Sequence, residues 1–379
     1  MNWFIITGEY PPQPGGVSDY TALVANGLAQ AGDQVEVCAP KACASRANGG
    51  AIRVHELPGG FGLASLRELN AGLAEGGLER QILVQYVPHA FGRRGLNLPF
   101  CFWLYSLRSR AISLVFHEVA YPFALNQPAA HNALAVVNRL MALLVARAAS
   151  RIFITTQAWA DPVKRMARRA TPVRWIPVPS TIPVEPIDAC QRAAIRARYN
   201  PRGSGVVGHF GTYGRLIRDS LAECIGHLAE NEGRCGVLLL GRNSQEFLSE
   251  LLSVRPEWSE RVHALGELSP QALSRHVAAC DVMLQPYPDG ITSRRTSVML
   301  ALAHGIPVVT NAGHLTERFW FGGDAVSFAF NNQPLTLAGS VAELLGNEAK
   351  RRRVGRSGQA LYSQKFDVRH TISALRSPT

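Results

Sequence analysis

Short apolar runs alternate with longer polar-and-apolar stretches along the first half of the chain. Such runs are typical of strands buried on both faces of a sheet. They occur at residues 3–6, 34–39, 81–85, 113–116 and 152–155. Residues 18–30 place their apolar side chains on one helical face, and residues 133–149 are another helix-length stretch. The alternation predicts an α/β protein with a parallel, doubly wound sheet.

The same alternation begins again after a proline-rich segment. Residues 175–182 read WIPVPSTI and are followed by Pro183 and Pro186, a composition typical of a domain edge. Further strands are expected at 205–210, 236–240, 262–265, 282–285 and 307–310, with the clearest helices at 270–279 and 297–304. We therefore expect two similar α/β domains that meet near residue 180, with a ligand at the carboxyl ends of their strands.

Length and composition agree with two domains. The 379 residues exceed what one hydrophobic core usually serves, and 47% of them are hydrophobic, which excludes a disordered or collagen-like chain. No run reaches the roughly 18 apolar residues of a membrane span, and the N-terminus lacks the features of a signal peptide. Seven scattered cysteines without CxxC spacing do not suggest disulfides or zinc. We expect a soluble, cytoplasmic protein without a metal.

The net charge of +11 predicts an anionic partner: nucleic acid, anionic phospholipid or a phosphorylated substrate. Basic residues form two runs, Lys164, Arg165, Arg168, Arg169 and Arg174, and Lys350, Arg351, Arg352, Arg353 and Arg356. Neither run is interleaved with the aromatic residues that base stacking needs, so we expect no nucleic acid. Two interpretations stay open, solvated helix faces or contact with an anionic membrane surface.

The first loop, EYPPQPGGVSD at residues 9–19, lies between a predicted strand and a predicted helix. Gly15 and Gly16 leave room for a ligand beside the unpaired N–H groups of the helix, a geometry that suits phosphate. A loop that needs glycine for its own turn is the alternative. The chain lacks GxGxxG and GxxxxGK[ST] motifs, so NAD-type and Walker-type sites lose their main support.

Several segments together resemble the retaining GT-B glycosyltransferases of family 4 (glycosyl transferases group 1). The opening GGVSDY and the later GDQVEV resemble the start of these enzymes. In the second half LLLG, LGEL, AACDV, QPYP and ALAHGIPVVT follow the family's order. The tail SQKFDVRHT resembles the terminal helix that crosses back to the first domain.

The resemblance implies a GT-B fold, with two Rossmann-like doubly wound domains facing across a cleft. Residues 1–180 would form the acceptor-side domain, 181–360 the nucleotide-sugar-binding domain and 361–379 the crossing helix. The implied activity is retaining, hexosyltransferase-like transfer from a UDP- or GDP-sugar in polysaccharide, glycolipid or glycoconjugate synthesis, with no metal or other cofactor. The acceptor would be lipid-linked and the protein peripheral at the inner face of the membrane.

Two motifs depart from the family pattern. The usual E-x7-E falls on Thr292 and Leu300, and an Arg and Lys six residues apart fall on Thr212 and Arg218. The replacing segment, DGITSRRTSVM, still places backbone N–H groups and arginines at a helix start, which suits an anion, and Asp289 could accept hydrogen bonds from sugar hydroxyls. The expected donor-binding residues are Gly15, Gly16, Gly211, Thr212, Arg215, Arg218, Asp289, Ser293, Arg294, Arg295 and Thr296. A solvated turn is the alternative for Arg294 and Arg295.

Two expected catalytic residues, His117 and Glu118, directly follow the predicted strand at 113–116. The resemblance implies a histidine at this place near the donor sugar and its phosphate, although a histidine after a strand can also be structural. His89 is a weaker acceptor-side candidate. Two other functions stay open: a catalytically impaired relative that acts as a binding partner, and a nucleotide-sugar epimerase.

Overall fold

The structure is a computed structural model that describes residues 1–40, 45–47, 50–75, 77, 79–92, 95–124, 126–200, 205–231, 235–329 and 333–378. It divides into two compact units, Met1–Val178 with Val368–Thr379, and Pro179–Asp367. We call the first unit 1 and the second unit 2.

Unit 1 contains an eight-stranded sheet in the order β3-β4-β2-β1-β5-β6-β7-β8. The strands are β1 (Asn2–Thr7), β2 (Gln34–Ala39), β3 (Ser45–Ala47), β4 (Ile52–Glu56), β5 (Gln81–Tyr86), β6 (Ile112–Phe116), β7 (Arg151–Ile154) and β8 (Val173–Trp175). All neighbours pair in parallel except β3 and β4. The helices are α1 (Gly16–Gln30), α2 (Leu63–Glu75), α3 (Leu98–Ser106), α4 (Ala129–Ala148), α5 (Ala160–Met166) and α13 (Val368–Arg376), with short 3₁₀ turns η2 (Pro88–Ala90) and η3 (Gln157–Trp159).

The sheet of unit 1 has a hydrophobic core on each face, which explains its continuous apolar strands. Successive residues of a strand point to opposite faces. Phe4 and Ile6 accordingly lie in one core with α2, α3 and α4, whereas Trp3 and Ile5 lie in the other with α1 and α13. Both faces are covered by helices, so the sheet is doubly wound, as the sequence predicts.

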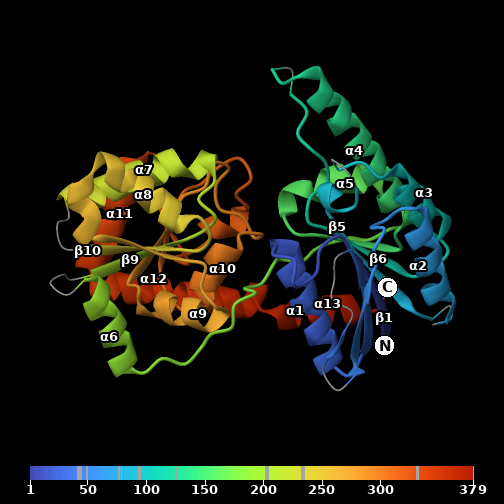
Figure 1. The fold of residues 1–379 in the computed structure, drawn as a ribbon, viewed down its shortest axis with the longest axis horizontal. Coiled ribbons are helices and arrows are strands. Elements are labelled where there is room, and N and C mark those ends of the chain that lie inside the picture. Colours follow the sequence, from blue (N-terminus) through green and yellow to red (C-terminus); the bar gives the residue numbers. More distant parts are fainter. Residues whose placement is uncertain are drawn as a thin grey trace. The chain divides into compact units, whose positions relative to one another are not determined.

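The terminal helix α13 packs against α1, within unit 1 (Figure 1). A Cβ on Gly27 of α1 would lie 2.7 Å from Ile372 Cδ1, so glycine permits this close approach. Arg151 Nη1 donates to the Ser377 carbonyl at 2.7 Å and Nη2 to the Leu375 carbonyl at 2.5 Å. These contacts fix the end of the described chain to the first sheet.

Helix α4 is long and apolar enough to cross a membrane by length and composition, with a mean hydropathy of 1.4. The sequence alone does not predict a membrane span here, because Arg139 and Arg147 interrupt the apolar run. In unit 1 the helix packs against α3, and Met141, Ala142, Val145 and Ala146 are fully buried. Only 33% of the most apolar 18-residue stretch of α4 is buried, so much of the apolar surface of this helix is exposed.

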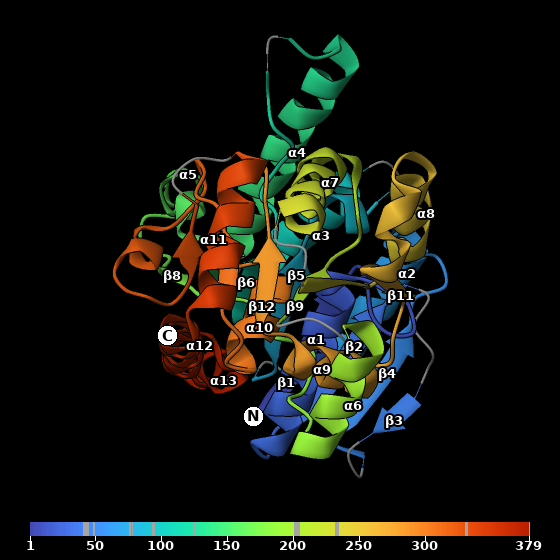
Figure 2. The ribbon, with the colours of Figure 1, turned by 90° about the vertical axis from the view of Figure 1, so that its left-hand side faces the viewer.

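Unit 2 contains a six-stranded, all-parallel sheet in the order β11-β10-β9-β12-β13-β14. The strands are β9 (Gly205–Phe210), β10 (Cys235–Leu240), β11 (Val262–Gly266), β12 (Val282–Gln285), β13 (Val308–Thr310) and β14 (Ser327–Phe328). The helices are α6 (Ala189–Tyr199), α7 (Arg215–Asn231), α8 (Ser244–Val254), α9 (Pro270–Ala279), α10 (Thr296–Ala303), α11 (Pro334–Gly346) and α12 (Glu348–Leu361), with short turns η4 (Pro256–Glu260), η5 (Arg318–Phe321) and η6 (Tyr362–Phe366). Figure 2 shows this sheet with α7 and α11 on one side and α9, α10 and α12 on the other.

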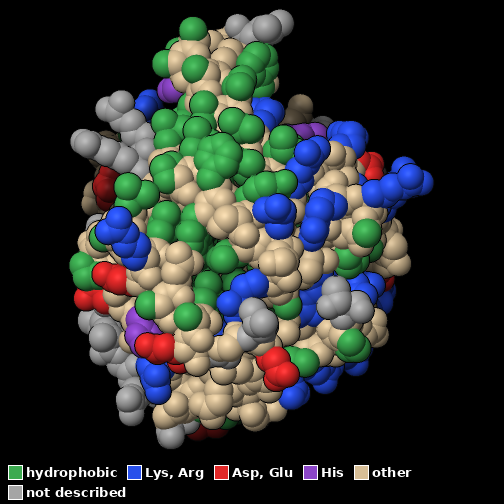
Figure 3. All heavy atoms as spheres, turned by 90° about the vertical axis from the view of Figure 1, so that its right-hand side faces the viewer, with side chains coloured by type: hydrophobic (Ala, Val, Ile, Leu, Met, Phe, Trp, Pro, Cys, Tyr) green, Lys and Arg blue, Asp and Glu red, His purple; other side chains and the backbone are tan. Residues whose placement is uncertain are grey.

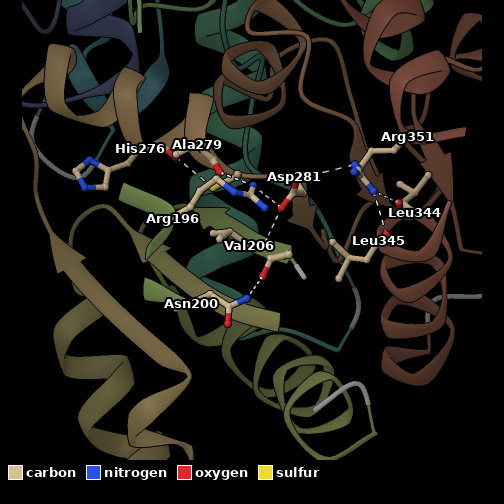
Figure 4. A network of polar contacts seen from close by, with 11 residues as sticks. Arg196, Asn200, Val206, His276, Ala279, Asp281, Leu344, Leu345 and Arg351 are labelled. Atoms are coloured by element: carbon tan, nitrogen blue, oxygen red, sulfur yellow. Dashed lines mark hydrogen bonds and ion pairs between the residues drawn. The ribbon is translucent and has the colours of Figure 1, made fainter. Parts of the chain in front are cut away.

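A carboxylate whose side chain is 14% exposed, that of Asp281, joins three elements at the amino ends of β9 and β12 (Figure 4). Asp281 Oδ2 accepts hydrogen bonds from Arg196 Nη1 of α6 at 2.6 Å and from the Val206 backbone N–H at 2.8 Å. Its Oδ1 lies 4.0 Å from Arg351 Nε of α12, and Arg351 also donates to two carbonyls at the end of α11. Asp281 therefore ties α6, β9 and α12 together.

We predict that Asp281→Ala lowers the free energy of unfolding of unit 2 by about 2–4 kcal/mol, because it removes the carboxylate that two arginines and a backbone N–H share. Urea unfolding measures the loss. Asp324→Ala is the control, since Asp324 pairs with Arg353 where both side chains are 58% exposed, and should cost less than about 1 kcal/mol. Equal losses would contradict the role given to Asp281.

Candidate active site

The loop between β9 and α7 forms the first part of the candidate site in unit 2. Tyr213 has a left-handed backbone (φ 54°), and its buried hydroxyl donates to the carbonyls of His209 at 3.2 Å and Leu240 at 3.1 Å. The anchored Tyr213 leaves Thr212 and Arg215 exposed at the start of α7. A helix start carries unpaired N–H groups and partial positive charge. The arrangement can therefore hold an anion.

His209 supports this loop from below. Its Nδ1–H donates to the Leu284 carbonyl at 2.8 Å, and a Cβ on Gly211 would lie 3.0 Å from its Nε2. Burial lowers the pKa of His209 from its ordinary 6.5 to about 4, so the imidazole is neutral at pH 7. Gly211 therefore lies directly on a rigid, uncharged ring, and its own N–H donates to the Leu240 carbonyl.

Two predicted donor-binding arginines of this region differ in their surroundings. Arg218 donates from Nε to the Tyr213 carbonyl at 2.7 Å and pairs with Glu246 and Glu250 of α8. The hydrogen bonds that Arg218 donates to the carboxylates of Glu250 and Glu246 raise its pKa. Arg215 is exposed and, in the part of the chain that the structure describes, makes no ion pair. Arg218 thus secures the loop, while the charge of Arg215 is available to a ligand.

The loop after β12 is held by polar contacts at each end. The Tyr287 backbone exchanges two hydrogen bonds with the Asn311 side chain, at 2.7 and 2.6 Å. Arg295 pairs with Asp289 and lies 4.5 Å above the Tyr287 ring. The Asp289 carboxylate, expected to accept from sugar hydroxyls, is therefore engaged by Arg295.

Glu317, between β13 and η5, is a buried carboxylate that holds this loop and that the sequence did not indicate. Its oxygens accept from the Ser293 backbone N–H at 3.2 Å, from Ser293 Oγ at 2.5 Å and from Trp320 Nε1 at 3.0 Å. Ser293 therefore gives its donors to Glu317 instead of pointing them outward, and Arg294 and Thr296 are half-buried beside the start of α10. The sequence holds no local signal for this contact, because the residues are 24 positions apart.

In unit 1 the predicted residues lie at the carboxyl ends of β1, β5 and β6, which are neighbours in the sheet. His117 is 8% exposed; its Nε2 lies 2.8 Å from Gln85 Oε1, and its ring meets Tyr20 edge-on at 4.8 Å. Glu118 is half-exposed and lies 3.5 Å from His89 Nδ1. The two expected catalytic residues therefore differ, with His117 fixed in the protein and Glu118 at its surface.

The first loop also brings Glu9 to this place. A Cβ on Gly15 would lie 2.5 Å from Glu9 Oε2, whereas a Cβ on Gly16 would meet nothing within 4 Å. The missing side chain of Gly15 thus accommodates a carboxylate of the same chain, and Gly16 keeps the start of α1 open. Among the residues that the structure describes, no group of three His, Cys, Asp or Glu side chains could hold a metal ion.

Two Rossmann-like units, each with its polar loops at the carboxyl edge of its sheet, are the architecture of the GT-B fold. Solved structures share this fold. Sucrose-phosphate synthase from Thermosynechococcus elongatus superposes with a TM-score of 0.72 at 16% identity, covering 99% of this chain and 97% of that chain. HepE from Anabaena, solved with UDP and glucose, gives 0.67 at 20% identity, covering 99% and 98%. WaaG, a glycosyltransferase involved in lipopolysaccharide biosynthesis, gives 0.66 at 14%, covering 99% and 100%.

Family models match both halves of the sequence. Residues 15–179 match the glycosyl transferase 4-like domain, and residues 219–377 match the glycosyl transferase-like model. No curated protein matches the chain in sequence. The chain belongs to the family 4 (group 1) glycosyltransferases, a retaining family that uses nucleotide-sugar donors.

We predict that the buried His209 makes unit 2 less stable in acid. Below pH 6.5 the unfolded chain binds a proton at His209 that the folded chain does not bind until about pH 4. Stability should therefore fall as the pH decreases through this window, by at most roughly 1.4 kcal/mol per pH unit. His209→Asn keeps a donor for the Leu284 carbonyl without this titration, so its unfolding free energy should fall less steeply in urea titrations. Parallel pH dependences in the two proteins would contradict the prediction.

Proposed function

We propose that the chain is an active, metal-independent, hexosyltransferase-like enzyme that transfers a sugar from a UDP- or GDP-sugar in polysaccharide, glycolipid or glycoconjugate synthesis. The start of α7 carries the proposal, because Thr212 and Arg215 lie exposed there beside N–H groups that suit a diphosphate. Gly211 and Arg218 shape this loop from behind. Arg294, Arg295 and Thr296 would add positive charge and donors at the start of α10, next to the engaged Asp289 and Ser293.

The chemistry that we propose retains the configuration of the sugar. The bond from the anomeric carbon to the diphosphate breaks while the acceptor oxygen bonds to the same face of the sugar, and a departing phosphate oxygen takes the acceptor proton. Positive charge at Arg215 and at the helix starts stabilises the leaving diphosphate. His117, fixed by Gln85, and Gly16 at the open start of α1 would contact the donor from unit 1, with Glu118 on the acceptor side.

One observation favours a second function, that of a catalytically impaired binding partner. The Asp289 carboxylate and the Ser293 N–H, both expected to bind the donor, are engaged by Arg295 and Glu317. Release of UDP or GDP from nucleotide-sugars distinguishes the two functions. An active enzyme transfers the sugar slowly to water and faster to an acceptor, and both reactions release the nucleotide. An impaired relative binds the nucleotide-sugar without releasing UDP or GDP. An epimerase would change the donor sugar without releasing the nucleotide.

We predict that Arg215→Ala weakens the binding of UDP or GDP by about 1–3 kcal/mol, since it removes a charge-assisted hydrogen bond. Calorimetry measures the change. Arg352→Ala removes a 72% exposed arginine on α12 and is the matched control, with unchanged affinity expected. Equal affinities in the two variants would remove Arg215 from the proposed diphosphate site.

We further propose that the acceptor is lipid-linked and that the protein attaches to the inner face of an anionic membrane. The five basic residues of the first run, Lys164 to Arg174, are all exposed on and after α5. Among the described residues none of the five forms an ion pair, whereas the second run is largely paired: Lys350 with Glu343, Arg352 with Glu348 and Arg353 with Asp324. Figure 3 shows hydrophobic side chains gathered beside Lys and Arg on one face of the molecule.

We predict that the protein attaches to anionic membranes through the first basic run and that high salt releases it. Each basic residue adds about 1 kcal/mol near an anionic surface, and screening shortens from ~10 Å at 0.1 M salt to ~3 Å at 1 M. The protein should therefore sediment with phosphatidylglycerol vesicles at low salt and leave them at 1 M. Arg165→Glu with Arg169→Glu should abolish binding, and Arg352→Glu with Arg356→Glu should not. Equal binding to neutral vesicles, or none to either kind, would refute the electrostatic model.

A further inference from the structure

Three ionisable side chains from three neighbouring strand ends meet in unit 1. Glu9 follows β1, His89 lies in η2 after β5, and Glu118 follows β6. Because β5 lies between β1 and β6, His89 stands between the two carboxylates. Its Nε2 is 3.9 Å from Glu9 Oε1, and its Nδ1 is 3.5 Å from Glu118 Oε2. We call these three residues the Glu–His–Glu cluster.

Glycines of the surrounding loops make this cluster possible. A Cβ on Gly8 would lie 2.4 Å from Ala90 Cβ, so any other residue would push η2 away from the loop after β1. A Cβ on Gly15 would occupy the place of the Glu9 carboxylate. Gly95 has a left-handed backbone (φ 77°), and a Cβ there would lie 3.5 Å from His89 Cα. The backbone is therefore built closely around the three side chains.

The surroundings of the cluster are acidic. Glu118 raises the pKa of His89 through its hydrogen bond, against the effect of burial, and Glu9 adds to the rise. Burial raises the pKa of Glu9; His89 lowers it, while Glu118 and Asp19 of α1 raise it. Tyr121, which lies near Glu118, also has a raised pKa through burial and this carboxylate. The cluster thus combines one imidazole with two carboxylates, which suits hydroxyl groups better than phosphate.

Unit 1 contains an apolar groove of about 920 Å³ whose lining includes the residues that follow His89 in the chain. Ala90, the next residue, lines it. Its apolar side chains come from four elements of unit 1 and include Phe61, Leu63, Phe91, Leu96, Leu98 and Val137. Leu63 is 70% exposed and Leu96 43%, so the groove opens to the surface with apolar edges. Exposed apolar surface next to polar groups is typical of a binding site.

We propose that unit 1 binds an amphipathic glycoside as the acceptor, with its sugar hydroxyls on the Glu–His–Glu cluster and its apolar tail in the groove. The proposal rests on the transferase function given above. A hydroxyl oxygen can lie about 2.8 Å from both His89 Nε2 and Glu9 Oε1, because these atoms are 3.9 Å apart. It accepts from Nε2–H and donates to Glu9. Glu118 lies 3.5 Å from His89 Nδ1 and orients the imidazole, so it is a positioning residue.

The test uses octyl and methyl glucoside, galactoside and mannoside, with the side-chain NMR signal of His89 as the reporter. An octyl glycoside should shift this signal and bind at least tenfold more tightly than the methyl glycoside of the same sugar. Glu9→Gln should weaken binding at least tenfold, and Glu68→Gln, an exposed change on α2, should not. Leu63→Ser with Leu96→Ser should remove the octyl advantage and keep methyl glycoside binding.

The pH dependence gives a second signature. Affinity should fall in acid as Glu9 is protonated, at a pH above the ordinary range of a glutamate. It should fall again in alkali as His89 loses its proton, above the ordinary 6.5. Glu118→Gln should move this second limb to lower pH, because the carboxylate that holds the imidazolium is gone.

Binding of UDP or GDP distinguishes the two proposals. If the wild-type protein binds a nucleotide and no glycoside shifts the His89 signal, the acceptor site is refuted and the transferase proposal stands. If glycosides shift His89 and neither nucleotide binds, the proposed donor chemistry fails and the glycoside site stands. An octyl glycoside that binds equally well to wild type and to Glu9→Gln also overturns the role of the cluster.

Discussion

Parallel strands end at a common edge of their sheet, and the chemistry of this chain depends on that constraint. The strands are apolar on both faces because helices cover both, so they offer almost no polar group to a ligand. Polar side chains are therefore confined to loops, and the carboxyl ends bring loops from distant parts of the sequence together. Glu9, His89 and Glu118 are neighbours for this reason alone, as are Thr212 and the loop that contains Ser293.

Carboxylates hold the loops of unit 2 by binding donors of the same chain. Asp281 collects Arg196, Arg351 and a backbone N–H at the amino edge. At the carboxyl edge Glu317 binds Ser293, and two glutamates of α8 bind Arg218. A donor that is satisfied within the protein contributes rigidity, whereas a ligand needs groups that remain accessible. This distinction separates Arg215 from Arg218, both of which the sequence predicts to bind the donor.

The fold could be predicted from the sequence to a large extent, because buried strands are read directly as apolar runs. Every strand predicted from such a run is present to within one residue at each end. The missed strands are β3, β4, β8 and β14, which are short or carry charged residues such as Arg53 and Arg174. The candidate site was less predictable, because its contacts form only in the folded chain. Ser293 donates to Glu317, 24 positions away, and the Glu9 carboxylate fills the space that a side chain at Gly15 would occupy.

The two units differ in the charge that they present to a substrate, and the difference assigns them different ligands. In unit 2 the candidate loops combine helix starts with arginines, which favour a diphosphate. In unit 1 the Glu–His–Glu cluster has two carboxylates and one imidazole, so it would repel an anionic ligand. A hydroxyl group, in contrast, can both donate and accept hydrogen bonds there. A Cβ on Gly16, at the start of α1, would meet nothing within 4 Å, so this helix start is open. A simple sugar would leave the apolar groove of unit 1 empty, whereas an acceptor with an apolar tail would fill it.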